Sequence, residues 1–181
     1  MSFLCALPHT HLVSIIIKIH YIEVNLSVVQ CGYPGLAQDY MGIMEKYQIN
    51  PQYINLEITE SASLAAKKTL LKNMHRLMEY GVHFSLDDFG TKYSNMDILS
   101  DVEFDVLKLD KSLVDKIDRD KVSGQIVKHI ISMCHDMKIQ TIAEGIEEEL
   151  QEAYLKKCRC MIGQGYLYGK PMEVEAFEKD F

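Results

Sequence analysis

The sequence alternates strand-like and helix-like segments, and this alternation restricts the possible folds more than any other feature. Short stretches rich in β-branched and aliphatic residues predict strands, and apolar residues at helical spacing predict helices between them. The predicted strands cover residues 12–27, 53–60, 82–86, 106–110, 139–143 and 160–163. Strands that alternate with helices form parallel sheets through right-handed crossovers. We therefore predict an α/β fold built from βα units around one core.

Glycine and proline mark the ends of several predicted helices. The helices are expected over residues 36–47, 61–80, 126–137, 147–157 and 174–181, with a short helical piece at 96–99. Gly81 and Asn50-Pro51 follow two of them, as is usual at helix ends. The expected buried faces are Leu64, Leu71, Met74 and Met78 in the second helix, and Ile126, Ile130, Met133 and Met137 in the third.

Composition excludes several classes of protein. The chain has 181 residues and a net charge of −7, which argues against general affinity for nucleic acid because that affinity needs a basic face. No apolar run approaches the roughly 20 residues that span a bilayer, so we expect no membrane insertion. The five cysteines form no Cys-x-x-Cys pair. Free thiols suit a reducing compartment, and the expected location is the cytoplasm.

Polar side chains follow every predicted strand. They are Asn25, Glu57 and Glu60, Asp87 and Asp88, Lys108 and Asp110, Glu144 and Glu147, and Gln164. In a parallel sheet all these strand ends lie on one side, and in a (β/α) barrel that side holds the active site. A random scatter of surface charges would not select the same end of six strands. The pattern therefore predicts a functional site at the carboxyl ends.

The residue types at these ends predict a site for hard cations. Amide and carboxylate oxygens suit Mg²⁺ or Mn²⁺ and do not suit zinc or copper. So many carboxylates favour two ions rather than one, with Asp87 as the natural bridge. Two interpretations of Lys108 are open at this point: it contacts a phosphate or an attacking water, or it forms a structural ion pair with a neighbouring acid.

Six ordered segments resemble one known family, the bacterial EAL domain. They are Glu23-Val24-Asn25-Leu26-Ser27, Leu56-Glu57-Ile58-Thr59-Glu60-Ser61, Asp87-Asp88-Phe89-Gly90-Thr91, Leu107-Lys108-Leu109-Asp110, Ala143-Glu144-Gly145-Ile146-Glu147 and Gln164-Gly165-Tyr166. The resemblance covers residues 21–181 and sets residues 1–20 apart as an atypical N-terminal segment. It implies a TIM-like (β/α) barrel and a phosphodiesterase that hydrolyses cyclic di-GMP to 5′-pGpG with two Mg²⁺ or Mn²⁺ ions.

The resemblance also implies roles for individual residues. The implied metal ligands are Asn25, Glu57, Asp87, Asp88 and Glu144. The implied catalytic residues are Lys108, Glu144 and Asp88, with Lys108 near the attacking water. The implied supporting residues are Glu60, Glu147 and Gln164. Glu60 resembles the glutamate that steadies the loop after Asp88. In the family this loop also takes part in dimerisation, so the resemblance implies a homodimer through it.

The sequence departs from the family at two points. The Glu-Ala-Leu motif is absent, so we expect the chain to form about six of the eight barrel strands. The glutamate of this motif is a metal ligand in the family, so the sequence lacks one implied ligand. Lys92 stands where the family usually has glycine. Three hypotheses remain open: an active phosphodiesterase, a catalytically inactive module that binds cyclic di-GMP or a protein, and a truncated gene fragment.

We predict that Asp87→Asn abolishes binding of a divalent cation, because the substitution removes the charge of the expected bridging carboxylate. Calorimetric titration with Mn²⁺ measures this directly. An unchanged Mn²⁺ affinity would contradict the bridging role of Asp87.

Overall fold

The computed structural model describes residues 21–59, 61, 67–91, 99, 103–117 and 119–173. These residues contain a six-stranded sheet whose strands follow one another in sequence order, each parallel to the next. The strands are β1 (Ile22–Leu26), β2 (Ile54–Thr59), β3 (His83–Phe89), β4 (Val106–Leu109), β5 (Gln140–Glu144) and β6 (Ile162–Gln164). This order is the one that consecutive right-handed βα units produce.

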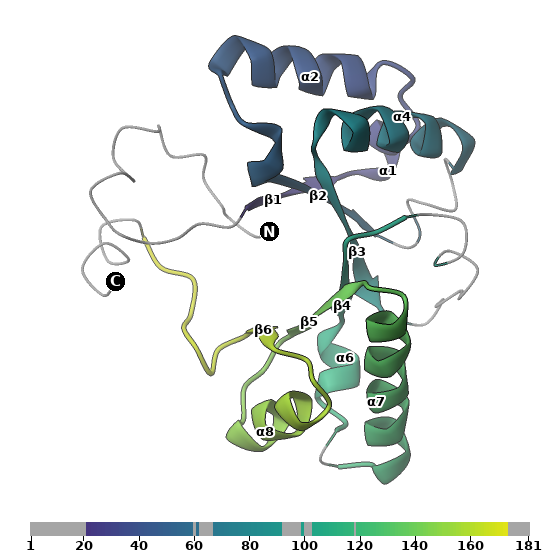
Figure 1. Ribbon diagram of the computed structural model, residues 1–181. Helices are drawn as coiled ribbons and strands as arrows, with labels where there is room; N and C mark the ends of the chain where they lie inside the picture. The colour runs from purple at the N-terminus through teal and green to yellow at the C-terminus, as the bar shows by residue number, and fades with distance from the viewer. Residues whose placement is uncertain are drawn as a thin grey trace.

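Helices connect the strands on the outer side of the curved sheet (Figure 1). They are α1 (Val28–Cys31), α2 (Leu36–Tyr47), the 3₁₀ turn η2 (Pro51–Tyr53), α4 (Lys67–Tyr80), α6 (Lys111–Val114), α7 (Lys121–Asp136) and α8 (Glu149–Lys157). Helix α4 packs against β3 and α2, and α7 packs against β5. The helices thereby cover the outer face and leave the inner face of the strands for polar side chains.

The central strands of the sheet are buried. All four residues of β4 are buried, and so are the four central residues of β2. Phe84, Leu86 and Leu107 are fully buried and join the apolar core with Leu70 and Leu77 of α4. Continuous burial of this kind is typical of parallel sheets. It fixes the backbone of the strands whose ends carry the polar residues.

Capping residues account for several element boundaries. The Asp120 carboxylate accepts hydrogen bonds from Val122 N at 3.1 Å and Ser123 N at 3.0 Å, so α7 begins at Lys121 rather than at the expected residue 126. Asn50 caps the turn at Pro51 through a bond from Gln52 N. Side-chain acceptors of this type satisfy amides that the first helical turn leaves unpaired.

The buried faces of two helices differ from the expected ones. In α7 the buried residues are Gly124, Val127, Ile131 and Cys134, whereas Ile126 and Met137 are exposed. In α4 they are Leu70, Asn73, Met74 and Leu77, so Met74 is buried as expected, while Leu71 and Met78 are only partly buried against the core. Both helices carry two apolar stripes side by side. Successive residues of a helix lie about 100° apart around its axis, so a small rotation of the helix decides which stripe faces the core. Close packing of Gly124, whose carbonyl accepts a bond from Tyr154 at 2.8 Å, favours the observed stripe of α7.

The expected six-stranded parallel arrangement is confirmed. Among the described strands, β1 and β6 each have a partner on one side only, so the sheet is an open part of a barrel. The predicted strand segment at 12–20, residues 62–66 of the second predicted helix with Leu64, the helical residues 96–98 and the helix at 174–181 lie outside the described residues.

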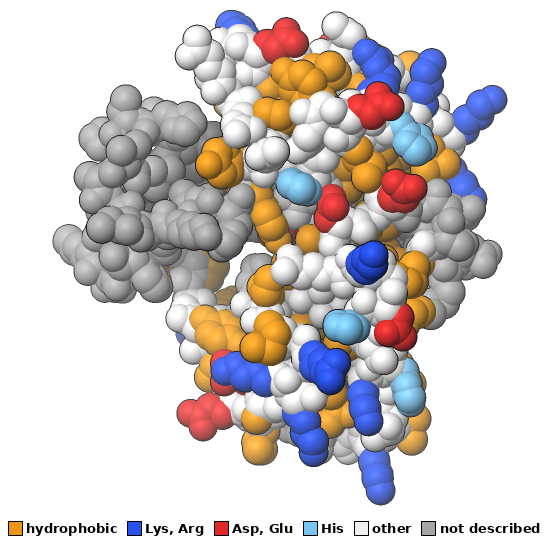
Figure 2. Space-filling model, in the orientation of Figure 1, with side chains coloured by type: hydrophobic (Ala, Val, Ile, Leu, Met, Phe, Trp, Pro, Cys, Tyr) orange, Lys and Arg blue, Asp and Glu red, His pale blue; other side chains and the backbone are white. Residues whose placement is uncertain are grey.

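Lys and Arg side chains gather on the outer helices. Figure 2 shows them over α7 and α8 and over α4. The net charge of −7 is therefore not spread evenly, because basic residues lie outside and several acids lie at the inner strand ends. Within the described part of the chain, no helix has the length and apolar character needed to cross a membrane.

We predict that Leu107→Ala lowers the free energy of unfolding by about 2–5 kcal/mol, because it opens a cavity at a fully buried position of β4. Chemical denaturation measures the change. The control is Val29→Ala, where the side chain is 84% exposed and we expect a change within about 0.5 kcal/mol. Equal losses for the two variants would show that β4 is not part of the stable core.

Candidate functional site

Four carboxylates surround the ammonium group of Lys108 on the inner side of the sheet. Lys108 comes from β4 and is 4% exposed. Its Nζ donates hydrogen bonds to Glu57 Oε1 and, at 2.7 Å, to Glu144 Oε1. Asp87 Oδ1 lies 3.8 Å away, and Glu23 Oε2 lies 3.6 Å away. The four acids come from β1, β2, β3 and β5 and converge on one positive charge; we call these four acids and Lys108 the Lys108 cluster.

Strand register explains why these residues meet. Glu23 of β1 pairs with Asn55, two residues before Glu57 of β2, and Lys108 of β4 pairs with Ile142, two residues before Glu144 of β5. Side chains alternate between the two faces of a strand, and paired residues of parallel neighbours point to the same face. The helices cover the opposite face, so the charged side chains take the inner one.

The charges of the cluster do not balance. Lys108 supplies one positive charge against four carboxylates. Burial raises the pKa of Glu57 to about 7, although the hydrogen bond from Lys108 opposes this shift. Burial also raises the pKa of Glu144. For Lys108, burial acts to lower the pKa, but Asp87 and the bonds to Glu144 and Glu57 outweigh it, so the net shift is upward. The lysine stays charged, and the excess is negative.

An irregularity in β3 contains the adjacent carboxylates Asp87 and Asp88. The register with β4 shifts between Leu86 and Phe89. Asp88 has φ 58°, in the left-handed region that aspartate tolerates better than most residues. Asp88 N donates to Asp87 Oδ1 at 2.9 Å. Burial and the neighbouring Asp87 and Asp110 raise the pKa of Asp88. Bulges often redirect side chains beside functional sites.

Gly90 completes this turn at φ 101°. A Cβ at this position would lie 2.1 Å from Leu113 Cδ1, so the close packing of α6 against the turn requires glycine.

Three of the remaining predicted residues are described, and none of the three is part of the Lys108 cluster. Asn25 is exposed at the end of β1, and Gln164 is exposed on β6. Glu147 pairs with Lys111 on the surface rather than with Lys108. Glu60 and Lys92 lie outside the described residues.

Glu23 belongs to the cluster, although sequence reasoning did not select it. It precedes Asn25 by two residues and therefore lies on the same face of β1. Strand alternation was the pattern that could have revealed it. Glu23 lies two residues before the polar strand end at Asn25, so a search of the strand ends alone does not include it.

The chemistry of the donor set fits a divalent cation. Carboxylates and an amide are oxygen ligands, and their excess negative charge is what such a cation would neutralise. Among the residues that the structure describes, no three His, Cys, Asp or Glu side chains are arranged to hold a metal ion as they stand. Lys108 takes the central position between the acids.

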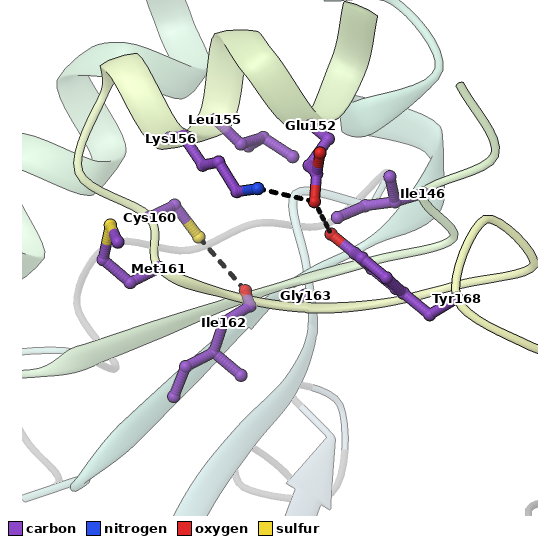
Figure 3. Close-up of a pocket in the computed structure, with 9 residues that line it drawn as sticks. All are labelled: Ile146, Glu152, Leu155, Lys156, Cys160, Met161, Ile162, Gly163 and Tyr168. Carbon is purple, nitrogen blue, oxygen red and sulfur yellow. Dashed lines mark hydrogen bonds and ion pairs between the residues drawn. The ribbon is translucent and has the colours of Figure 1, made fainter. Parts of the chain in front are cut away.

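A small pocket lies elsewhere, between α8 and β6 (Figure 3). Glu152 accepts bonds there from Lys156 at 2.8 Å and from Tyr168 at 3.1 Å. Its polar groups thus pair with one another and tie the segment after β6 to α8. No member of the Lys108 cluster lines this pocket.

We predict that Lys108→Met lowers the free energy of unfolding by about 3–5 kcal/mol at pH 8, because buried carboxylates lose their cation. A carboxyl group whose pKa is raised in the folded state lowers the free energy of unfolding as pH rises through that pKa. At pH 5 Glu57 is protonated and needs no cation, so we expect Lys108→Met to lower the free energy of unfolding by less at this pH. Denaturation at both pH values measures it. Lys128→Met, at an exposed position of α7, is the control, and a loss that does not vary with pH would contradict the assignment.

Comparison with known proteins identifies the fold and the family. The EAL domain model matches residues 7–171. A relative from Escherichia coli strain K12, named probable cyclic di-GMP phosphodiesterase PdeB, is 38% identical over 157 residues, which are 87% of this chain and 30% of the relative. The chain therefore spans about a third of that relative's length.

Solved structures agree with this result. The EAL enzyme Bd1971 in its form with cAMP and cyclic di-GMP bound superposes with a TM-score of 0.83 at 32% identity, over 88% of this chain and 42% of that one. The BlrP1 complex of Klebsiella pneumoniae with manganese and cyclic di-GMP gives 0.78 at 25% identity, over 85% and 40%. The open six-stranded sheet with its ring of acids is thus part of a TIM-like barrel, and the chain belongs to the EAL domain family.

Proposed function

We propose that this chain binds cyclic di-GMP and hydrolyses one of its phosphodiester bonds to give 5′-pGpG, with two Mg²⁺ or Mn²⁺ ions as cofactors. The observation that carries the proposal is the convergence of four carboxylates from parallel strands on one buried lysine, on the inner face of the sheet. The names of the relatives support it, since PdeB is named a probable cyclic di-GMP phosphodiesterase and BlrP1 is described in a complex with manganese and the nucleotide.

Electrostatics supports the need for cations. Cyclic di-GMP is an anion, and the cluster that would receive it has three more carboxylates than ammonium groups. Repulsion between like charges would keep the nucleotide away unless cations lie between them. When bound, the ions would polarise the phosphodiester and lower the pKa of a water molecule.

The residues of the chain would then have separate tasks. The proposed ligands are Asn25, Glu57, Asp87, Asp88 and Glu144. Lys108 donates hydrogen bonds and is therefore suited to a phosphate oxygen or to the attacking water once the acids beside it bind cations. Glu60, Glu147 and Gln164 would support the site from its rim.

An inactive binding module is the second candidate. The Glu-Ala-Leu motif is absent from the sequence, and Lys108 is bonded to Glu57 and Glu144 in the structure. A site in which the lysine keeps these bonds could hold the nucleotide without turning it over. We also propose that the protein forms a homodimer through the loop after Asp88 and is located in the cytoplasm.

The test is chromatography of cyclic di-GMP incubated with the purified chain and Mn²⁺. We expect 5′-pGpG from the wild type and none from Asp87→Asn, because that variant lacks a central carboxylate. Asp136→Asn is the matched control, since this side chain is 82% exposed on α7, and it should keep full activity.

Two results would change the proposal. If the folded wild type gives no product but binds cyclic di-GMP in a calorimetric titration, the binding module is correct. If product also forms with Asp87→Asn, the Lys108 cluster is not the catalytic site.

A further inference from the structure

All the buried side-chain oxygen and nitrogen atoms without a hydrogen-bond partner in the described chain come from three neighbouring strands. They are Glu23 Oε1, Asn55 Oδ1 and Nδ2, and Ser85 Oγ. Each of these residues precedes a proposed metal ligand by two positions: Glu23 precedes Asn25, Asn55 precedes Glu57, and Ser85 precedes Asp87. They therefore lie on the same face as those ligands, one step further into the sheet.

Polar atoms of this kind are costly to bury alone. A buried group without a partner loses about 1–3 kcal/mol relative to a paired one. Asn55 and Ser85 are fully buried. Their concentration on one face of β1, β2 and β3 indicates that this face receives a polar ligand.

The pairing of β1 with β2 defines the position of that ligand. Glu23 pairs with Asn55, and Asn25 pairs with Glu57. Paired residues lie about 4.8 Å apart across the strands, and the two pairs are about 6.6 Å apart along them. Two carboxylates at opposite corners and two side-chain amides at the others thus form a compact group of oxygen ligands, which we call the β1–β2 quartet.

Glu23 has the reach and the free atom to take part. Its side chain is one carbon longer than that of asparagine, and its Oε2 comes within 3.6 Å of Lys108 Nζ. Its Oε1 remains buried without a partner. Lys108 therefore forms an ion pair with one oxygen of this carboxylate, and the other oxygen is left for a further positive charge.

We propose that Glu23 and Asn55 are additional ligands of a hard divalent cation, which the β1–β2 quartet holds through the carboxylates of Glu23 and Glu57 and the amide oxygens of Asn25 and Asn55. Oxygen ligands of mixed charge are suited to Mg²⁺ and Mn²⁺. This inference rests on the proposed metal-dependent function. It adds Glu23 and Asn55, which lie inside their strands, to the ligands proposed at the strand ends.

The experiment is calorimetric titration of the full chain with MnCl₂ in the absence of nucleotide. Glu23→Gln keeps the shape of the side chain and removes its charge, and we expect a loss of Mn²⁺ affinity of about tenfold or more, as for other residues close to a metal. The control is Glu79→Gln, the same substitution at an exposed position of α4, which should bind as the wild type does.

A second variant covers the case in which Glu23→Gln does not fold. Asn55→Asp adds a carboxylate to the quartet, so Mn²⁺ should raise the melting temperature of this variant by more than it raises that of the wild type. Circular dichroism verifies that each variant is folded before titration.

The outcomes separate this inference from the proposed function. If the wild type binds Mn²⁺ and forms 5′-pGpG while Glu23→Gln binds Mn²⁺ equally well, the inference is wrong and the function stands. If Asn55→Asp gains no additional thermal stabilisation from Mn²⁺, Asn55 is not a ligand. If the wild type does not bind Mn²⁺ at all, both proposals are wrong.

Discussion

The ion pairs of Lys108 are the interaction on which the inner face of the sheet depends. A lysine buried to this extent requires negative partners, and four acids from β1, β2, β3 and the end of β5 supply them. Those acids in turn are held at short range only because the lysine lies between them. The cluster therefore links five strands electrostatically on the inner face of the sheet.

The outer face supplies the rigidity that such a cluster needs. Phe84, Leu86 and Leu107 anchor β3 and β4 in the apolar core, while α4 and α7 cover them. The left-handed Asp88 and the glycine that follows it then turn the chain sharply at the edge of this rigid region. A fixed backbone on one side and an excess of like charge on the other are the conditions under which a protein binds a cation tightly.

The sequence predicted the order of the strands and the side on which charged residues gather, because both follow from alternation and from the polarity of strand ends. It identified Glu57, Asp87, Lys108 and Glu144, which the structure brings together. It did not identify Glu23, since the reach of a side chain across β1 depends on register with neighbours that are distant in sequence. The predicted buried stripe of α7 differs from the observed one for a related reason. The helix has two apolar stripes, and the close contact of Gly124 with Tyr154 favours burial of the observed one.

Strand β1 has a second consequence, which concerns association between molecules. Among the described strands it is bonded to a neighbour on one side only, and unpaired edges are places where another chain can add a strand. The same strand carries Glu23 and Asn25. A chain that joined this edge would place its own side chains next to those two residues, so self-association would change the surroundings of the proposed cation ligands.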